Sequence, residues 1–336
     1  MSPQVEEVNQ VKESVEAQIM STPNVVGVGV GYEVSGGVPT GQIGVVVLVR
    51  RKLPLAALSP EAVLPKRVDS VPVDVVEVGE LRAQQARTDR WRPAPGGVSL
   101  GHFKITAGTL GCVVRDKNTN TRLILSNNHV LANSNDATPG DAILQPGPAD
   151  GGSTNLDQIA TLERFRPIDF SSSPGSCSLA NAYVELGNAI ARLLGSSHRL
   201  DSHRSNPQAT NMIDAALARP LNDADVLDEI LEIGTVSGTV EATLGMPVRK
   251  SGRTTGFTTG QINLLNATVS VSYGVGKTAV FQNQLIAGPM SQGGDSGSLV
   301  VAGDSLRAVG LLFAGSNQTT IFNPIQAVLD DLQVVI

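Results

Sequence analysis

Apolar stretches in this chain are short, rich in valine and soon ended by glycine, proline or a charged residue. The longest, residues 43–49, ends at Arg50 and Arg51. The 336 residues include 35 glycines and 19 prolines, and only 3% are aromatic. Because valine favours strands while glycine and proline favour turns, this pattern predicts a turn-rich β protein. No stretch approaches the roughly 20 apolar residues that a membrane-spanning helix needs.

The balance of charge argues against several classes of partner. The formal net charge is −6, and charged residues make up 17% of the chain. Such a surface gives no electrostatic reason to bind nucleic acid or an anionic membrane, and we expect neither partner. The N-terminal residues are acidic where a secretory signal would be basic and then apolar. We therefore expect a cytoplasmic protein.

Two cysteines, Cys112 and Cys177, stand alone in the sequence. A cytoplasmic chain would keep both reduced, and no histidine lies near either at metal-ligand spacing. His198 and His203 are five residues apart, but no pattern of carboxylates accompanies them. We expect no metal and no other cofactor.

The first 90 residues predict a small α+β domain. Apolar residues recur every three or four positions over 3–20, which indicates a helix, with Ser2 as its cap and Pro3 in its first turn. Three valine-rich segments follow as predicted strands, with Gly36-Gly37 as the first turn: 24–32, 42–51 and 71–78. The polar segment 83–97, which ends in prolines and glycines, is the best candidate for a linker.

Residues 91–336 have a different texture, with many short strand patterns. Segments 108–115 and 122–126 flank the turn sequence DKNTN and predict a hairpin. Apolar residues at helical spacing over 179–194 predict a helix, and 224–231 is a second helix candidate. A third helix is expected over 324–332, after Asn323 and Pro324.

The strongest local signal is Gly293-Gly-Asp-Ser-Gly-Ser298, which is followed by the apolar residues 299–301. A serine between glycines at the start of a strand can lie on a tight turn with its oxygen exposed. Glycines let the backbone approach a ligand closely, and such a turn can aim N–H groups at a developing oxyanion. A plain β-turn explains the motif about as well when it is taken alone.

A nucleophilic serine needs a base and an acid that orients the base. His129 follows the apolar segment 123–125 and a short polar turn, which places it at the rim of a strand. His102, just after the linker, has a surface position as its expected fate. Asp214 is a single acid among apolar residues, and burial of such an acid is costly unless it is paired. A strand-end acid remains the alternative for Asp214.

The order His129, Asp214, Ser296, with these neighbours, resembles the trypsin-like (chymotrypsin-fold) serine peptidases. The segment Val248-Arg-Lys-Ser-Gly-Arg-Thr-Thr-Gly256 resembles the bacterial branch that includes α-lytic protease and the streptogrisins. The resemblance covers about 105–332. It implies a mainly β fold of two six-stranded antiparallel β-barrels after the small α+β domain. The implied segments are a first barrel at about 100–220 with a helical insertion at about 165–210, a second barrel at about 230–322 and a C-terminal helix at about 324–332.

The resemblance also implies roles for individual residues. Ser296 would attack a carbonyl carbon, His129 would take its proton, and Asp214 would orient His129. The backbone N–H groups of Gly294 and Ser296 would form the oxyanion hole. Asp295 would pair with a basic residue, for which Lys250 is preferred to Arg253; both basic residues could equally be surface charges.

By the same resemblance, Met290 would form the floor of a pocket for the substrate side chain, and Phe313 and Gly315 would line its wall. A thioether floor favours small or medium apolar side chains, although simple core packing explains Met290 equally well. One departure concerns the wall segment 311–313, which lacks the serine that usually binds the catalytic acid. The orientation of Asp214 must then depend on other donors.

The first functional hypothesis is therefore a serine endopeptidase that acts on protein or peptide substrates through an acyl-enzyme. A catalytically weak or latent scaffold that binds peptides or assembles is the second. An esterase-like acyl transferase with the same serine chemistry is the third. Self-association is compatible with the apolar helix at 179–194 and with the helical N-terminus, but nothing in the sequence sets a number of subunits.

Overall fold

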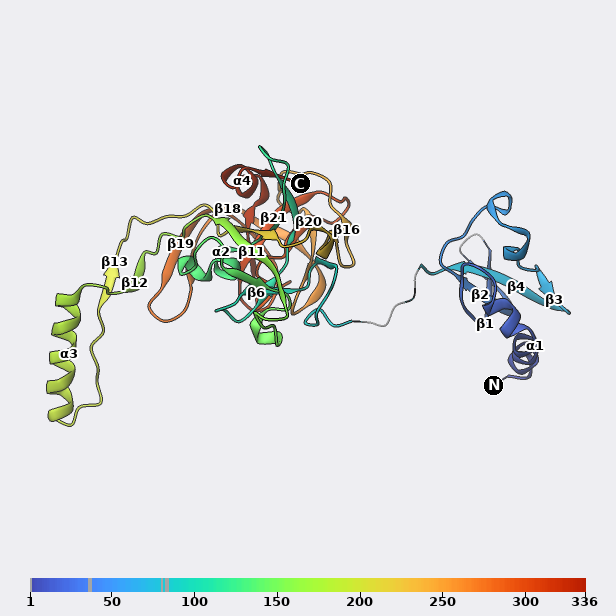
Figure 1. The fold of residues 1–336 in the computed structure, drawn as a ribbon, viewed down its shortest axis with the longest axis horizontal. Coiled ribbons are helices and arrows are strands. Elements are labelled where there is room, and N and C mark those ends of the chain that lie inside the picture. The colour runs from blue at the N-terminus through green and yellow to red at the C-terminus, as the bar shows by residue number, and fades with distance from the viewer. Residues whose placement is uncertain (1, 36–37, 80, 82–84) are drawn as a thin grey trace. The chain divides into compact units, whose positions relative to one another are not determined.

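The computed structural model describes residues 2–35, 38–79, 81 and 85–336. The predicted turn at Gly36-Gly37 lies outside the described residues, as do residues 83 and 84 of the predicted linker. The chain divides into two compact units, Met1–Gln85 and Ala86–Ile336. Each unit is described by itself (Figure 1).

The N-terminal unit packs one helix on a four-stranded sheet. Helix α1 (Pro3–Met20) begins at Ser2, whose Oγ accepts a hydrogen bond from the N–H of Val5, and Pro3 occupies its first turn. The sheet has the order β1 (Val25–Ser35), β2 (Val38–Val49), β4 (Val71–Glu77), β3 (Arg67–Val68). The pair β1–β2 is antiparallel and β2–β4 is parallel. Two short 3-10 helices, η1 (Leu55–Ala57) and η2 (Pro60–Ala62), join β2 to β3. The predicted helix and three strands are confirmed.

The first sheet of the second unit is antiparallel, with the order β23, β8, β9, β14, β11, β10, β6, β7. The single stretch 108–116 contains both β7 and β8; it pairs with β6 at one end and with β9 at the other, which closes a ring of strands. The pairing β8–β9 is the predicted hairpin. The bounds in chain order are β6 (Ser99–His102), β7 (Gly108–Thr109), β8 (Cys112–Asp116), β9 (Arg122–Ser126), β10 (Ala142–Leu144), β11 (Gln158–Phe165), β14 (Ala216–Pro220) and β23 (Val334–Val335).

The second antiparallel sheet has the order β13, β12, β19, β18, β17, β20, β21, β22. An additional pairing of β19 with β22 closes six of these strands into a ring, while the hairpin β12–β13 adds at the side. The sheets therefore hold eight strands each, because short strands extend the six-stranded rings that the resemblance implies. The bounds are β12 (Ser172–Pro174), β13 (His203–Ser205), β17 (Pro247–Gly252), β18 (Gly256–Ser272), β19 (Thr278–Ala287), β20 (Leu299–Ala302), β21 (Ala308–Gly315) and β22 (Thr320–Pro324).

Two sequence predictions need correction near the start and middle of this unit. The boundary between the two units falls within the predicted linker 83–97, but the end of that segment forms β5 (Ala94–Gly96). The candidate helix at 224–231 is instead strand β15 (Val226–Ile230), which pairs in parallel with β5 and antiparallel with β16 (Gly234–Thr235). Only the turn η5 (Asp223–Asp225) before it is helical.

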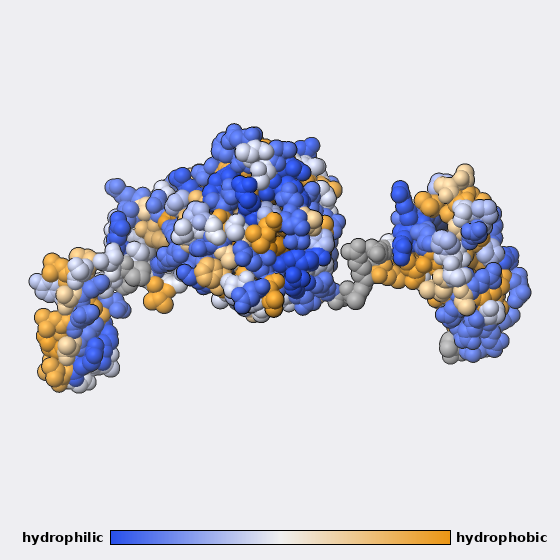
Figure 2. All heavy atoms as spheres, in the orientation of Figure 1, coloured by the Kyte–Doolittle hydropathy of each residue, from blue (hydrophilic) through white to orange (hydrophobic). Residues whose placement is uncertain are grey.

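Helices occupy the margins of the second unit. Helix α4 (Ile325–Asp331) buries Ile325 and Val328 and coincides with the predicted C-terminal helix. In chain order, helix α3 (Ser178–Leu193) lies between β12 and β13 (Figure 1). Strand β12 pairs with both β13 and β19. Its apolar side chains are exposed and form a hydrophobic face in Figure 2; they include Leu179, Tyr183, Leu186, Ile190 and Leu193. Among the described residues, no helix combines the length and apolar character needed to span a bilayer.

Candidate active site

Two neighbouring strands of the first sheet carry His129 and Asp214. Ser126 at the end of β9 pairs with Ala216 at the start of β14. His129 lies three residues beyond Ser126, on the one-turn helix α2 (Asn128–Leu131), and Asp214 lies two residues before Ala216. The ladder thus places a histidine and an acid that are 85 residues apart in the chain at the same end of the barrel.

The imidazole of His129 and the carboxylate of Asp214 are in direct contact. Nδ1 of His129 is 2.6 Å from Oδ2 of Asp214, and the backbone N–H of His129 donates to Oδ1 at 3.3 Å. The Asp214 side chain is fully buried, whereas that of His129 is 22% exposed. Because an ionised carboxylate only accepts hydrogen bonds, Nδ1 carries the proton, and Nε2 of the neutral ring is free to accept one.

The loop that carries Ser296 is attached to the first barrel. The N–H of Thr109 donates to the carbonyl oxygen of Ser296 at 2.8 Å, and the hydroxyl of Thr109 donates to that of Gly294 at 2.9 Å. Gly297 has φ +96°, and a Cβ there would lie 2.1 Å from Oγ of Ser126. Only glycine fits this close approach, so the Gly-Asp-Ser-Gly motif serves both the turn and the contact between barrels.

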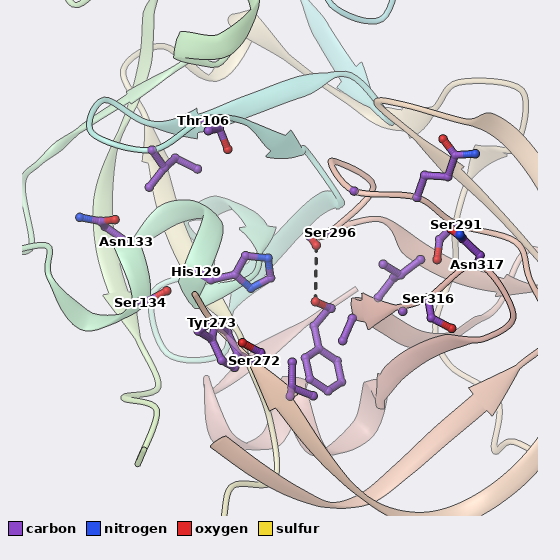
Figure 3. Close-up of a pocket in the computed structure, with 18 of the residues that line it drawn as sticks. Thr106, His129, Asn133, Ser134, Ser272, Tyr273, Ser291, Ser296, Ser316 and Asn317 are labelled. Atoms are coloured by element: carbon purple, nitrogen blue, oxygen red, sulfur yellow. Dashed lines mark hydrogen bonds between the residues drawn. The ribbon is translucent and has the colours of Figure 1, made fainter. Parts of the chain in front are cut away.

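Ser296 and His129 both line one cavity of about 820 Å³, to which both barrels contribute (Figure 3). The Ser296 hydroxyl donates to the carbonyl oxygen of Phe313 at 3.4 Å, a long bond. Within the described part of the chain, no hydrogen bond joins Ser296 to His129. The three residues of the predicted triad are brought to one site, but the serine hydroxyl donates to Phe313 and not to the imidazole.

The backbone before Ser296 is arranged to present N–H groups. Gly294 has φ +97°, and a Cβ there would lie 2.4 Å from Oγ1 of Thr254. The N–H groups of Gly294 and Ser296 donate to no acceptor in the described residues. Two unpaired donors beside a serine hydroxyl can bind an oxyanion.

Asp295 holds this loop through a buried network. Lys250 Nζ lies 3.2 Å from its Oδ2, and both side chains are fully buried. Oδ2 also accepts hydrogen bonds from the Thr255 hydroxyl at 2.6 Å and from the N–H of Gln292 at 3.0 Å. Burial raises the pKa of Asp295, but the hydrogen bond from Thr255 and the charge of Lys250 outweigh it, so the pKa is lowered overall.

Lys250, rather than Arg253, is therefore the cation that lies against Asp295. Arg253 instead contacts Asp150 of the first barrel, with Nε 2.6 Å from Oδ2 and Nη2 2.5 Å from Oδ1. This two-pronged contact is a second link between the barrels.

Met290, expected at the floor of a substrate pocket, lies elsewhere. It is 3% exposed, belongs to the core of the second barrel with Val248 and Ile262, and does not line the cavity. Gly260 leaves room for its thioether, because a Cβ there would lie 2.7 Å from the sulfur. Phe313 and Gly315 do line the cavity. The nearby lining is polar and uncharged, with Ser291, Gln292, Ser316 and Asn317 (Figure 3).

His102 is also placed differently from the expectation of a surface position. Its imidazole is fully buried, and Nε2 lies 3.1 Å from Oδ2 of Asp141. The two cysteines are apart, Cys112 buried and Cys177 exposed. The described residues contain no cluster of three or more His, Cys, Asp or Glu side chains that could hold a metal ion.

Sequence reasoning missed one residue at the site. The Tyr273 hydroxyl donates to Oδ2 of Asp214 at 2.8 Å, and its ring lies edge-on to that of His129, with centroids 5.8 Å apart. The absence of a hydroxyl in 311–313 signalled that another donor was needed, but not which one. Tyr273 is one of three tyrosines in the chain.

Comparison with known proteins gives likenesses of fold. No protein-family model matches the chain. A solved Nocardiopsis protease (NAPase) is 18% identical over 72% of this chain and 98% of its own, with a TM-score of 0.46. Thermobifida fusca protease A is 18% identical over 72% and 99%, with a TM-score of 0.44. A glutamic acid specific serine protease is 17% identical over 72% and 100%, with a TM-score of 0.45. At these identities and TM-scores, only the geometry of the site itself can support a function.

Proposed function

We propose that this protein is a serine endopeptidase. The observation that carries the proposal is that a serine hydroxyl and an imidazole whose Nδ1 is held by a buried carboxylate line one cavity. The unpaired N–H groups of Ser296 itself and of nearby Gly294 lie beside that hydroxyl in the chain. A nucleophile, a base with its orienting acid and an oxyanion site together define acyl transfer.

In the reaction, the Ser296 hydroxyl rotates from the Phe313 carbonyl toward Nε2 of His129. The oxygen of Ser296 attacks the substrate carbonyl carbon while Nε2 takes its proton. Asp214 stabilises the resulting imidazolium, and the N–H groups of Gly294 and Ser296 bind the oxyanion. Nε2 then protonates the leaving amine, and water releases the acyl group by the reverse sequence. Each donor of the oxyanion hole contributes roughly 10²–10³ in rate.

A peptide suits the cavity better than a compact ester. Strand β21 pairs with β20 as far as Leu311, and among the described strands none pairs with 313–315 on the side of Ser296. An extended substrate can add there as a strand. Lys104 is the only Lys, Arg, Asp or Glu among the described residues that line the cavity. Because the lining beside Phe313 and Gly315 carries uncharged polar side chains, we propose an uncharged side chain at the cleaved residue.

A latent form is the second candidate, and the hydroxyl of Ser296 favours it. That hydroxyl is bonded to Phe313 and not to His129. Latency here would depend on whether substrate binding moves this hydroxyl from the Phe313 carbonyl to Nε2 of His129. The cytoplasmic location expected from the sequence stays a prediction.

The test is digestion of an unstructured protein substrate by the full chain, followed by mass spectrometry of the products. Cleavage after uncharged residues, absent in Ser296→Ala, is the expected result. Parallel peptide and ester panels separate an endopeptidase from an esterase. Turnover of esters alone would contradict the peptidase, and no turnover by intact protein would favour the latent form.

A further inference from the structure

The buried carboxylate of Asp214 receives no hydrogen bond from the wall segment 311–313. The wall segment beside the nucleophile consists of Leu311, Leu312 and Phe313, none of which carries a hydroxyl. A buried carboxylate is strongly destabilised unless donors surround it. Besides His129, the described residues supply one side-chain donor to this carboxylate, the phenol of Tyr273 at 2.8 Å from Oδ2.

Tyr273 is held rigidly from both sides. It follows the last residue of β18, and its N–H donates to the carbonyl oxygen of Lys277 across the hairpin tip. The ring of Phe170 packs edge-on against it, with centroids 5.7 Å apart and an angle of 77°, and the Phe281 ring lies 6.2 Å away. A phenol fixed in this way keeps its donor aimed at one oxygen with little loss of entropy on each turnover.

The Tyr273 hydroxyl also stays protonated under ordinary conditions. Burial, followed by the charge of Asp214 and the hydrogen bond to it, raises the pKa of Tyr273 well above its ordinary value of 10.0. The group is therefore a donor, not an anion, throughout the neutral range.

We propose that Tyr273 is a positioning residue for the peptidase reaction: its hydroxyl fixes Oδ2 of Asp214, the same oxygen that receives Nδ1–H of His129. The inference rests on the proposed function. Without the phenol, Oδ2 keeps a single side-chain partner, and the carboxylate can turn away from the imidazole. Nε2 of His129 would then face Ser296 in a smaller fraction of molecules.

This placement connects the site to the insertion that carries α3. Phe170 precedes β12, and the N–H of Ser171 donates to the carbonyl oxygen of Thr278 at 2.8 Å. Lys277 lies over the Phe170 ring at 5.4 Å and pairs with Asp136 at 2.9 Å. The base of the insertion therefore packs against the tyrosine that contacts the catalytic acid, and Phe170→Ala should weaken the same hydrogen bond by loosening the ring.

The first experiment compares Tyr273→Phe with Tyr183→Phe in the full chain. Tyr183 is 69% exposed on α3 and serves as the matched control. Loss of a hydrogen bond to a charged group predicts a fall in kcat of roughly 10- to 100-fold for Tyr273→Phe, with KM unchanged. Tyr183→Phe should keep both constants. A kcat within about twofold of the parent, or a change in KM alone, would overturn the proposal.

The second experiment does not require activity and so separates this proposal from the proposed function. The His129 Nδ1 proton, in a 2.6 Å contact with a carboxylate, should give a strongly downfield proton resonance in NMR spectra, absent in His129→Ala. Tyr273→Phe should shift or broaden this resonance, while Tyr183→Phe leaves it in place. An inactive parent protein with an unchanged resonance in Tyr273→Phe would refute both proposals. An inactive parent with a shifted resonance would refute the function and retain the positioning role.

Discussion

The first barrel contains two histidine–carboxylate pairs that differ in what surrounds the ring. In the pair His129–Asp214 the acid is fully buried and the imidazole is 22% exposed. In the pair His102–Asp141 the imidazole is fully buried and the acid is 29% exposed. Nδ1 of His102 accepts the N–H of Lys104 at 3.2 Å while Nε2 contacts Asp141. Both ring nitrogens of His102 are therefore occupied.

The comparison indicates which features make a histidine available as a base. A carboxylate partner alone is not sufficient, because both His102 and His129 have one. The base needs a nitrogen that is free and that faces a cavity with a nucleophile, and only His129 meets this condition of the two. His102 serves instead to join β6 to the segment before β10.

Replacement of each histidine in turn tests whether the two rings differ in function, and it should give the largest effect. His129→Ala and Ser296→Ala should each lower kcat/KM by about 10⁴- to 10⁶-fold, because the base and the nucleophile act as one unit. The measurement is steady-state hydrolysis of a cleaved peptide found in the digest. His102→Gln is the control and should stay within a few-fold of the parent. Equal losses in His129→Ala and His102→Gln would remove the distinction between the rings.

Replacement of each acid by its amide tests whether the two carboxylates differ in function in the same way. Asp214→Asn should reduce kcat about 10⁴-fold, because an amide that donates to Nδ1 leaves the proton on Nε2, the wrong tautomer for a base. Asp141→Asn should have little effect on kcat. The same peptide assay checks both variants, and comparable rates for Asp214→Asn and Asp141→Asn would show that Asp214 does not orient a catalytic base.

The pair Lys250–Asp295, in which both side chains are fully buried, extends the comparison to a site without an imidazole. Lys250→Met leaves the buried Asp295 carboxylate without its cation, which should destabilise the fold by about 3–5 kcal/mol. Denaturant unfolding measures the loss, and Lys117→Met, at a partly exposed pair with Asp330, is the control. A loss below about 1 kcal/mol would mean that the hydrogen bonds from Thr254, Thr255 and Gln292 suffice for Asp295.

The same pair predicts a dependence of stability on pH. The folded pKa of Asp295 is lowered from 3.8, so the unfolded chain binds more protons in that range. The contribution of Asp295 is therefore complete above about pH 5 and is lost as the pH falls below about 4. Lys250→Met should lose less stability than the parent as the pH falls below about 4, because the cation helps to lower this pKa. If the free energy of unfolding changes with pH by the same amount in the parent and in Lys250→Met, the charge of Lys250 has no effect on the pKa of Asp295.

The smallest effect is expected at the second histidine. His102→Gln should lower the free energy of unfolding by about 1–3 kcal/mol, because it leaves buried hydrogen-bonding groups imperfectly paired. Denaturant unfolding again provides the value. A variant as stable as the parent would indicate that the His102–Asp141 contact contributes nothing measurable to the fold.

Sequence reasoning succeeded where the determinants are local. The helix at α1 follows from apolar spacing and a cap at Ser2, and the hairpin β8–β9 follows from two short runs around a polar turn. The motif around Ser296 is also local, since its glycines serve the turn and the close contact of Gly297 with Ser126. His129 and Asp214 could be proposed because their order with Ser296, and the residues around them, resemble a known family. The lone acid among apolar residues did not by itself distinguish Asp214 from a strand-end acid.

The failures involve partners that are distant in the chain. Strand β15 reads as a helix candidate because its pairing partner, β5, lies about 130 residues earlier. For Met290, a pocket floor and core packing were both left open, because the resemblance supplies a position but not the space beside Gly260 that its side chain fills in the core. Tyr273 reaches Asp214 from a hairpin of the other barrel, and no short-range pattern announces a contact across 59 residues.

The central claim is that Ser296 is a nucleophile activated by His129 at the junction of two barrels. The most direct measurement is the site and rate of modification by a fluorophosphonate, followed by intact-mass analysis and peptide mapping of the full chain. We predict one adduct per chain, located on Ser296, absent in Ser296→Ala and strongly slowed in His129→Ala but not in His102→Gln. Modification of another residue, or an equal rate on Ser296 with and without His129, would contradict the claim.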